Sequence, residues 1–221
     1  MSHPSPAGLS FDDLHKLPPG PAARVLTKHS VTLQTELDAP ASASASEVLA
    51  ELHNKSALLD MLQILAHTLP PREATWWSCL AAREMGAQTS AVGAAEQWVR
   101  QPGFDTRLAA REALDAAKQD DDTVFCAMAA CFADGTMGPG EFDDHAAPNG
   151  AVGAAVYSML LIALYADEAT VAERSALFLE RGLNIARGGN GKIEPNSDKA
   201  ALTKGTASTS GAGTAANPNE V

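Results

Sequence analysis

The chain has 221 residues, of which 45% are apolar and only 5% aromatic, and its formal charge at pH 7 is -11. This length is enough for one domain with a sizeable core. The 16 basic residues are scattered along the chain, which argues against a nucleic-acid partner, because a phosphate-binding surface gathers Lys and Arg. The acidic balance favours a soluble protein and, if it attracts a charged partner, a basic protein.

Residues 1–43 are predicted to be an N-terminal segment with short helices. One capped helix is expected to begin at Ser10, and another over residues 21–29, where Pro21 suits the first helical position. Residues 31–37 alternate apolar and polar side chains as a strand does, but no other segment offers a partner strand for their hydrogen bonds. We therefore expect coil or a helix extension there.

Residues 44–189 are predicted to form an all-α domain, with helices joined by short loops. Ser44 or Ser46 is expected to cap the first helix, and Asn54 separates it from a second, leucine-rich helix. Asp105 is expected to cap a later helix. Helix-breaking residues and the spacing of apolar side chains predict the remaining helices over residues 71–85, 90–99, 105–119, 122–133, 151–165 and 170–187.

Residues 190–221 are small, polar and nearly free of bulky apolar side chains. Such a segment cannot bury enough surface to offset the entropy of ordering, so we expect a disordered tail that folding does not require. The sequence GGNGK at residues 188–192 imitates the end of a phosphate-binding loop. It lacks the upstream glycine and follows a helix rather than a strand, so a helix end followed by a linker is the better interpretation.

The stretch LPPREATWWSCLAAREM, residues 69–85, contains two adjacent tryptophans. Two consecutive helical residues point about 100° apart, so Trp76 and Trp77 cannot share one face. One of them is expected to anchor the core and the other to cover an edge. We expect Trp76 to be the deeper one, because Cys79 and Leu80 continue its face.

The stretch also has a functional interpretation, in which Trp77 belongs to a surface that binds a partner. Glu73 and Glu84 share the helix face of Trp77, which predicts that this face is turned towards solvent. An exposed tryptophan beside charged side chains is typical of an interaction hot spot. The predicted interaction surface therefore consists of Arg72, Glu73 and Trp77.

Cys79, Cys126 and Cys131 show no C-x-x-C spacing, so neither a zinc knuckle nor a redox pair is predicted. Buried thiols in a reducing compartment are the better interpretation. The six histidines are dispersed, without the H-E-x-x-H arrangement of a zinc protease, and no G-x-S-x-G marks a serine hydrolase. We therefore predict no catalytic residue, no cofactor and no metal ligand.

One loop offers an alternative to this prediction. The breaker-rich connection at residues 134–150 gathers Glu141, Asp143, Asp144 and His145, whose oxygen and imidazole groups are of the kinds that bind divalent ions. Its spacing lacks the glycine and terminal glutamate of a calcium-binding EF-hand loop. A solvated acidic loop is the preferred interpretation.

The chain is predicted to be cytoplasmic. Its first residues show no basic stretch followed by an apolar run, so no signal peptide is expected. The most apolar stretch, residues 151–166, is too short to span a bilayer comfortably and is followed directly by Asp167 and Glu168. It is expected to be a core helix.

Several segments, taken in order, resemble a family of uncharacterised bacterial helical proteins of unknown function with a Leu-Pro-x-Arg-Glu-Ala-x-Trp-Trp core. They are LAHTLPPREATWWSCLAAR (65–83), AAEQWVRQP (94–102), RLAAREAL (107–114), AMAACFADGTMGP (127–139) and FLERGLNIARG (178–188). The resemblance spans roughly residues 45–190 and implies no catalytic residue. It also associates such proteins with type VI secretion gene clusters. One departure is DGTMGPG at residues 134–140, where the family tends to have a Gly-Gly-Ser-type loop.

The leading functional hypothesis is a non-enzymatic adaptor, scaffold or accessory protein that acts through protein–protein contacts. Two alternatives stay open at this point. One is a metal-dependent enzyme or effector that uses the acidic loop at residues 141–145. The other is a binder of small ligands with a pocket between helices, and the absence of such a pocket would favour the adaptor.

Overall fold

Nine α-helices and one short 3-10 helix make up the regular structure of residues 9–193, the part of the chain that the computed structural model describes. The helices are α1 (Ala22–Lys28), α2 (Ala45–Asn54), α3 (Leu58–Thr68), α4 (Pro71–Glu84), α5 (Ser90–Arg100), α6 (Phe104–Asp115), α7 (Val124–Cys131), α8 (Ala151–Tyr165) and α9 (Val171–Ala186), with the 3-10 helix at Glu168–Thr170. Within this range there is no strand, which confirms the all-α prediction. Most of the predicted tail, residues 194–221, lies outside the described residues.

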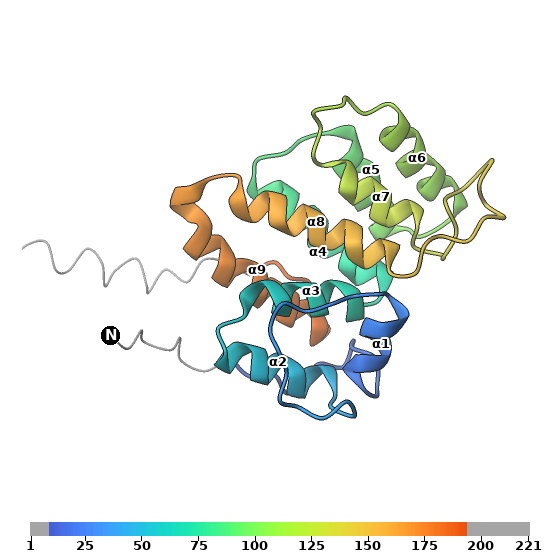
Figure 1. Ribbon diagram of the computed structural model, residues 1–221. Coiled ribbons are helices and arrows are strands. Elements are labelled where there is room, and N and C mark those ends of the chain that lie inside the picture. Colours follow the sequence, from blue (N-terminus) through green and yellow to red (C-terminus); the bar gives the residue numbers. More distant parts are fainter. Residues whose placement is uncertain (1–8, 194–221) are drawn as a thin grey trace, which may run out of the picture.

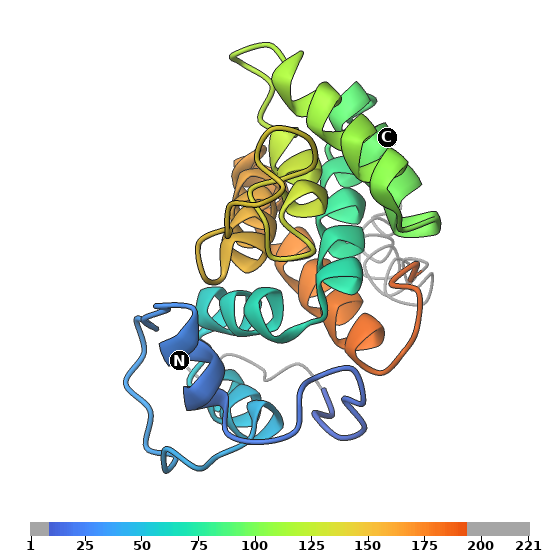
Figure 2. The same ribbon diagram turned by 90° about the vertical axis from the view of Figure 1, so that its right-hand side faces the viewer.

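Helices α4 and α8 pack against each other at the centre of the molecule (Figure 1). Helices α5, α6 and α7 pack together on one side of this pair, while α1, α2 and α3 lie on the other (Figure 2). Helix α9 contacts α3, α4 and α8. Because α8 is apolar on nearly every side, it suits a position covered by several neighbours.

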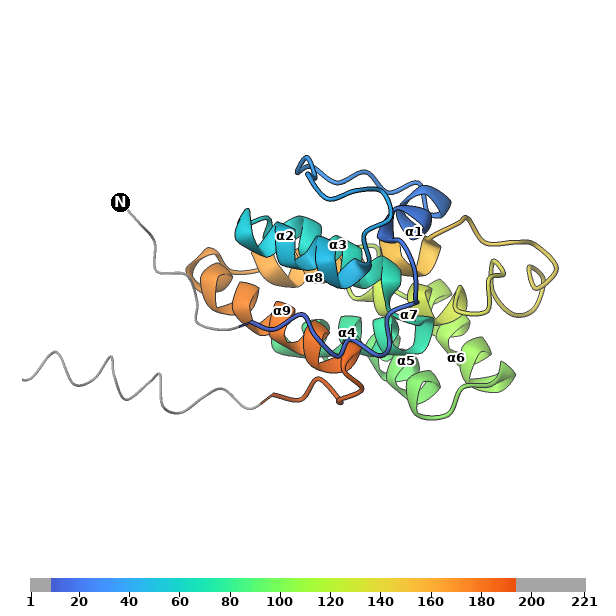
Figure 3. The ribbon, with the colours of Figure 1, turned by 90° about the horizontal axis from the view of Figure 1, so that it is seen from below.

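The N-terminal segment is part of the same core. Leu14, Leu17 and Ala22 are buried in the apolar cluster that the later helices form. Figure 3 shows the first described residues running beside α9 and α4, where the backbone N–H of Lys16 donates to the carbonyl of Ala186 at 2.8 Å. This segment therefore stabilises the end of α9 as well as covering apolar surface.

The predicted helix at Ser10 is wrong, and residues 9–20 contain only turns and bends. The Ser10 hydroxyl accepts a hydrogen bond from the backbone N–H of Asp12 at 3.1 Å, a local alternative to helical bonding. Asp13 then takes a positive φ of 58°, which a helix cannot accommodate. Helix α1, by contrast, is present where a helix was predicted, but it begins at Ala22, so Pro21 is the N-cap rather than the first helical residue.

Residues 31–37 form no helix or strand, in agreement with the prediction of coil. Two of their backbone donors, the N–H groups of Gln34 and Thr35, bind the carboxylate of Asp60 at 2.9 and 2.8 Å. Asp60 is only 3% exposed. A buried carboxylate on α3 thus satisfies the hydrogen bonds that a partner strand would otherwise provide.

Helix α6 differs from its prediction at both ends. It begins at Phe104, after an extended Gly103, so Asp105 lies in the first turn and does not cap the helix. It ends at Asp115 rather than near residue 119. Turn bonds replace the helix there, since the N–H of Asp121 donates to the carbonyl of Lys118 at 3.0 Å.

Ser44 is the cap of α2. Its side chain accepts a hydrogen bond from the backbone N–H of Glu47, whose carboxylate in turn accepts one from the N–H of Ser44 at 2.7 Å.

We expect Ser44→Ala to lower the free energy of unfolding by about 1 kcal/mol. Ser46→Ala, inside the helix, is the matched control and should cost clearly less in denaturant melts. A larger loss for the Ser46 variant would contradict this assignment.

Candidate functional site

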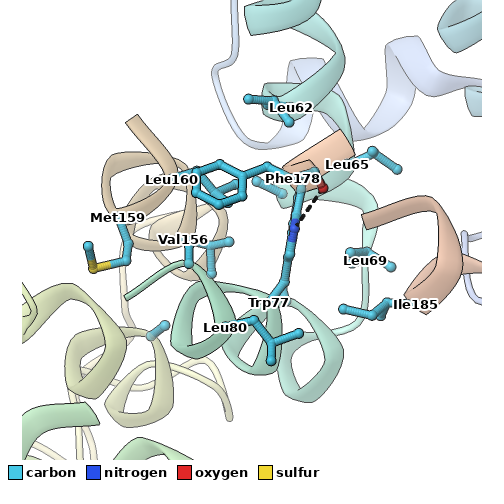
Figure 4. Packing of buried hydrophobic residues seen from close by; sticks show 14 of the residues in the cluster. Leu62, Leu65, Leu69, Trp77, Leu80, Val156, Met159, Leu160, Phe178 and Ile185 are labelled. Carbon is cyan, nitrogen blue, oxygen red and sulfur yellow. Dashed lines mark hydrogen bonds between the residues drawn. The ribbon is translucent and has the colours of Figure 1, made fainter. Parts of the chain in front are cut away.

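The burial of the two tryptophans of α4 is the reverse of the prediction, which made Trp76 the more buried of the two. Trp77 is 0% exposed, whereas Trp76 is only partly buried. The indole N–H of Trp77 donates to the carbonyl of Phe178 on α9 at 3.1 Å (Figure 4). Its ring lies against Gly182, where an added Cβ would come within 2.7 Å of Trp77 Cζ2. Trp77 is therefore a core residue and cannot belong to an exposed interaction surface.

The acidic residues that share the face of Trp77 led to this error. Glu73 pairs with Lys16 at 2.8 Å, and Glu84 pairs with Arg181 at 3.0 Å. Both carboxylates lie at the ends of α4 and reach cations from other segments. Helix α4 also contacts α5, α7, α8 and α9, so most of its circumference is covered. Charged residues at its ends consequently do not mark a solvent face.

Trp76, and not Trp77, is the tryptophan of α4 that reaches the protein surface. Its indole N–H donates to the carbonyl of Asn190 at 2.6 Å. The ammonium of Lys192 lies over the ring, 5.7 Å from its centroid, within the range of a cation–π contact. The side chain is partly buried and packs against the core cluster, so it is both anchored and accessible.

Arg72 and Glu73 lie next to Trp76 on the first turns of α4. Arg72 is exposed, and its Nε donates to the carbonyl of Val99 on α5 at 2.6 Å. The Glu73 side chain retains 23% exposure beside Lys16. We call the set Lys16, Arg72, Glu73 and Trp76 the motif surface. It combines two cations, one carboxylate and a partly exposed indole on a rigid helix.

The acidic loop turns its side chains outward. Residues 141–146 are exposed. Their side chains also contact one another, as Asp144 Oδ1 and His145 Nδ1 do at 2.6 Å. The Phe142 ring lies 5.2 Å from the guanidinium carbon of Arg111 on α6. Nowhere in residues 9–193 do three or more His, Cys, Asp or Glu side chains gather in a way that would hold a metal ion.

All three cysteines are free and buried, as predicted. Contact with Cys126, followed by burial, raises the pKa of the Cys79 thiol well above its usual value. Burial raises the pKa of Cys131 to about 11. Cys79 and Cys131 are therefore thiols rather than thiolates, and they contribute packing rather than nucleophilic chemistry.

Two histidines that are far apart in the sequence meet in the fold. Nδ1 of His67 on α3 lies 3.4 Å from Nδ1 of His29, which follows α1. Burial lowers the pKa of His67 to about 4, with a smaller contribution from the charge of His29, and burial also lowers the pKa of His29. No spacing rule reveals a pair separated by 38 residues, so this pair was not predicted from the sequence.

The surface hollows of residues 9–193 include two that lie near helix ends. One, of about 230 Å³, lies beside the proline-rich turn that precedes α1 and is smaller than a typical ligand pocket. The other is an open depression over the turn between α6 and α7. Neither combines apolar walls with titratable side chains that converge from several helices.

Within residues 9–193, no single helix is both long and apolar enough to cross a membrane. Helix α8 and the segment 168–186 meet that criterion only when taken together, and a bend of 100° separates them.

A family model described as a family of unknown function, DUF6931, matches residues 48–186. The matched range contains Arg72, Glu73 and both tryptophans of α4, whereas Lys16 and Lys192 lie outside it. Neither the curated proteins nor the solved structures include a significant match to the chain.

Proposed function

The chain belongs to DUF6931, a family of unknown function, and from that premise we propose that it is a non-enzymatic adaptor or scaffold that acts through protein–protein contacts. The observation that carries the proposal is the motif surface, and above all Trp76. Tryptophan and arginine are the side chains that most often dominate binding energy at protein interfaces. Here they lie one turn apart on a helix whose other faces are fixed by packing.

The anchoring of Trp76 adds to this argument. A partly exposed indole that is already held by the core loses little conformational entropy when a partner covers it. Arg72 is similarly positioned, because its Nε is bound to the carbonyl of Val99 while the side chain stays exposed. Such preorganised groups favour tight contacts over a small area.

We further propose a cytoplasmic bacterial setting in which the partner is a component of a type VI secretion system. This finer assignment is supported only by the resemblance of residues 65–83 and the segments that follow to helical proteins associated with such gene clusters. The charge of -11 favours a partner with a basic surface.

The test begins with affinity capture from the native host and identification of partners by mass spectrometry. The affinity of the purified partner is then measured for the wild type and for Trp76→Ala and Arg72→Glu. Loss of a hot-spot side chain typically costs about 2 kcal/mol or more, so we expect affinity to fall by about thirtyfold or more.

Tyr165→Ala is the matched control, since this aromatic side chain is 56% exposed at the far end of α8. It should leave the affinity unchanged, and circular dichroism should show that all three variants are folded. The proposal fails if Trp76→Ala and Arg72→Glu bind the partner as the wild type does.

A further inference from the structure

Residues 188–192, which we call the strap, follow α9 and lie across α4. Helix α9 ends at Ala186, and the chain turns at Gly188, whose φ is +94°. It then passes Trp76 closely enough for the carbonyl of Asn190 to accept the indole hydrogen bond. This is the GGNGK sequence that imitates a phosphate loop, and its role in the fold is contact with Trp76.

Gly191 holds the strap in place. It is buried with a φ of +67°, and an added Cβ would come within 2.8 Å of both Leu80 Cδ1 and Ile185 Cδ1. Its backbone N–H donates to Oδ1 of Asn184 on α9 at 2.9 Å. A residue with a side chain would be strained there and would push the strap away from α4.

The part of the strap beyond this anchor contributes little to the core. Lys192 is exposed, and its ammonium lies over the Trp76 ring. The strap therefore presents two groups to Trp76, namely a backbone carbonyl for the indole N–H and a cation for the ring face. Those are also the groups with which an extended peptide would recognise an indole.

We propose that the Trp76 site binds an extended segment of a partner that carries a basic side chain, and that the strap occupies this site as an intramolecular competitor. The inference rests on the proposed function, because it identifies the chemistry and the regulation of the same surface. A partner gains access by displacing residues 190–192. The competition is effective because a tethered segment acts at about millimolar effective concentration.

The first experiment asks whether the strap covers Trp76 reversibly. In the full-length chain, Gly191→Ala should release the strap, and Asn184→Ala should loosen it without adding a methyl group. Acrylamide quenching of tryptophan fluorescence reports on Trp76, because Trp77 and Trp98 are 0% and 7% exposed. We expect quenching to increase in both variants, while circular dichroism shows the helices intact. Unchanged quenching in both variants would overturn the inference.

The second experiment supplies the strap sequence in trans. The peptide acetyl-Gly-Gly-Asn-Gly-Lys-Ile-amide is titrated into the wild type and into Gly191→Ala, and the NMR signal of the Trp76 indole N–H is followed. We expect the variant to bind at least about tenfold more tightly, because its own strap no longer competes. A matched peptide with Glu in place of Lys should bind about two- to fivefold more weakly, as expected from loss of a cation–π contact.

The two proposals fail in different ways. If Gly191→Ala exposes Trp76 but neither peptide binds, or if the Glu peptide binds more tightly than the Lys peptide, the inference about the partner segment is overturned. Either result leaves the adaptor function standing as long as Trp76→Ala and Arg72→Glu lose the captured partner. If those variants keep the partner while the Lys peptide binds, the proposed function fails instead.

Discussion

Replacing Trp77 with alanine should lower the free energy of unfolding by about 3–5 kcal/mol. The indole is completely buried between α4 and α9, and the carbonyl of Phe178 would lose the donor that it now has at 3.1 Å. A loss of this size is a large part of the stability of a typical domain. The measurement is a denaturant melt followed by circular dichroism, because the substitution also alters the fluorescence.

Trp76→Ala is the matched control for this prediction. The same side chain is removed one residue earlier, but the indole is only partly buried and its partners belong to residues 190–192. We expect a cost of about 1–2 kcal/mol. A larger loss for Trp76→Ala than for Trp77→Ala would contradict the assignment of Trp77 as the core anchor.

The contact between Trp77 and Gly182 gives a second test of the same packing. In the wild type, Gly182→Ala brings a methyl group within 2.7 Å of the indole, and overpacking of this kind typically costs about 1–3 kcal/mol. In the Trp77→Ala background the clash is gone. Alanine in the interior of α9 should then stabilise the helix by up to about 1 kcal/mol. Equal effects in the two backgrounds would show that the residues are not in contact.

Acidification should destabilise the protein through His67. Its pKa is about 4 in the fold against an ordinary 6.5, because burial disfavours the charged imidazole. Between these values the unfolded chain binds a proton that the folded chain does not, so stability falls as the pH drops from about 6.5 to about 4. The expected loss from this group is about 2 kcal/mol at pH 5 and about 3 kcal/mol below pH 4.

His67→Gln should remove most of this pH dependence, although it will also lower the stability at pH 7. His29→Gln is the informative comparison, because burial, and not the charge of His29, is the larger cause of the low pKa of His67. It should therefore retain most of the slope. Urea melts between pH 4 and 7.5 measure all three proteins. A slope for His67→Gln equal to that of the wild type would contradict the prediction.

The sequence by itself determined the positions of most helices. Apolar spacing and the helix-breaking residues around Asn54, Gly86 and Gly150 act locally, so α2, α4 and α8 begin or end close to their predicted positions. The capping box of Ser44 and Glu47 is also a local arrangement. Where local signals competed, as at Ser10, a side-chain turn formed in place of the predicted helix.

The tertiary structure alone decided which groups are buried and which meet. Helical periodicity separates the faces of Trp76 and Trp77, but it does not say how many neighbours cover each face. That depends on α9, about one hundred residues later, where Gly182 leaves room for the Trp77 ring. The same holds for the contact between His29 and His67 and for the strap over Trp76. Each joins segments far apart in the chain, and their proximity follows from the packing of the whole core rather than from any local preference.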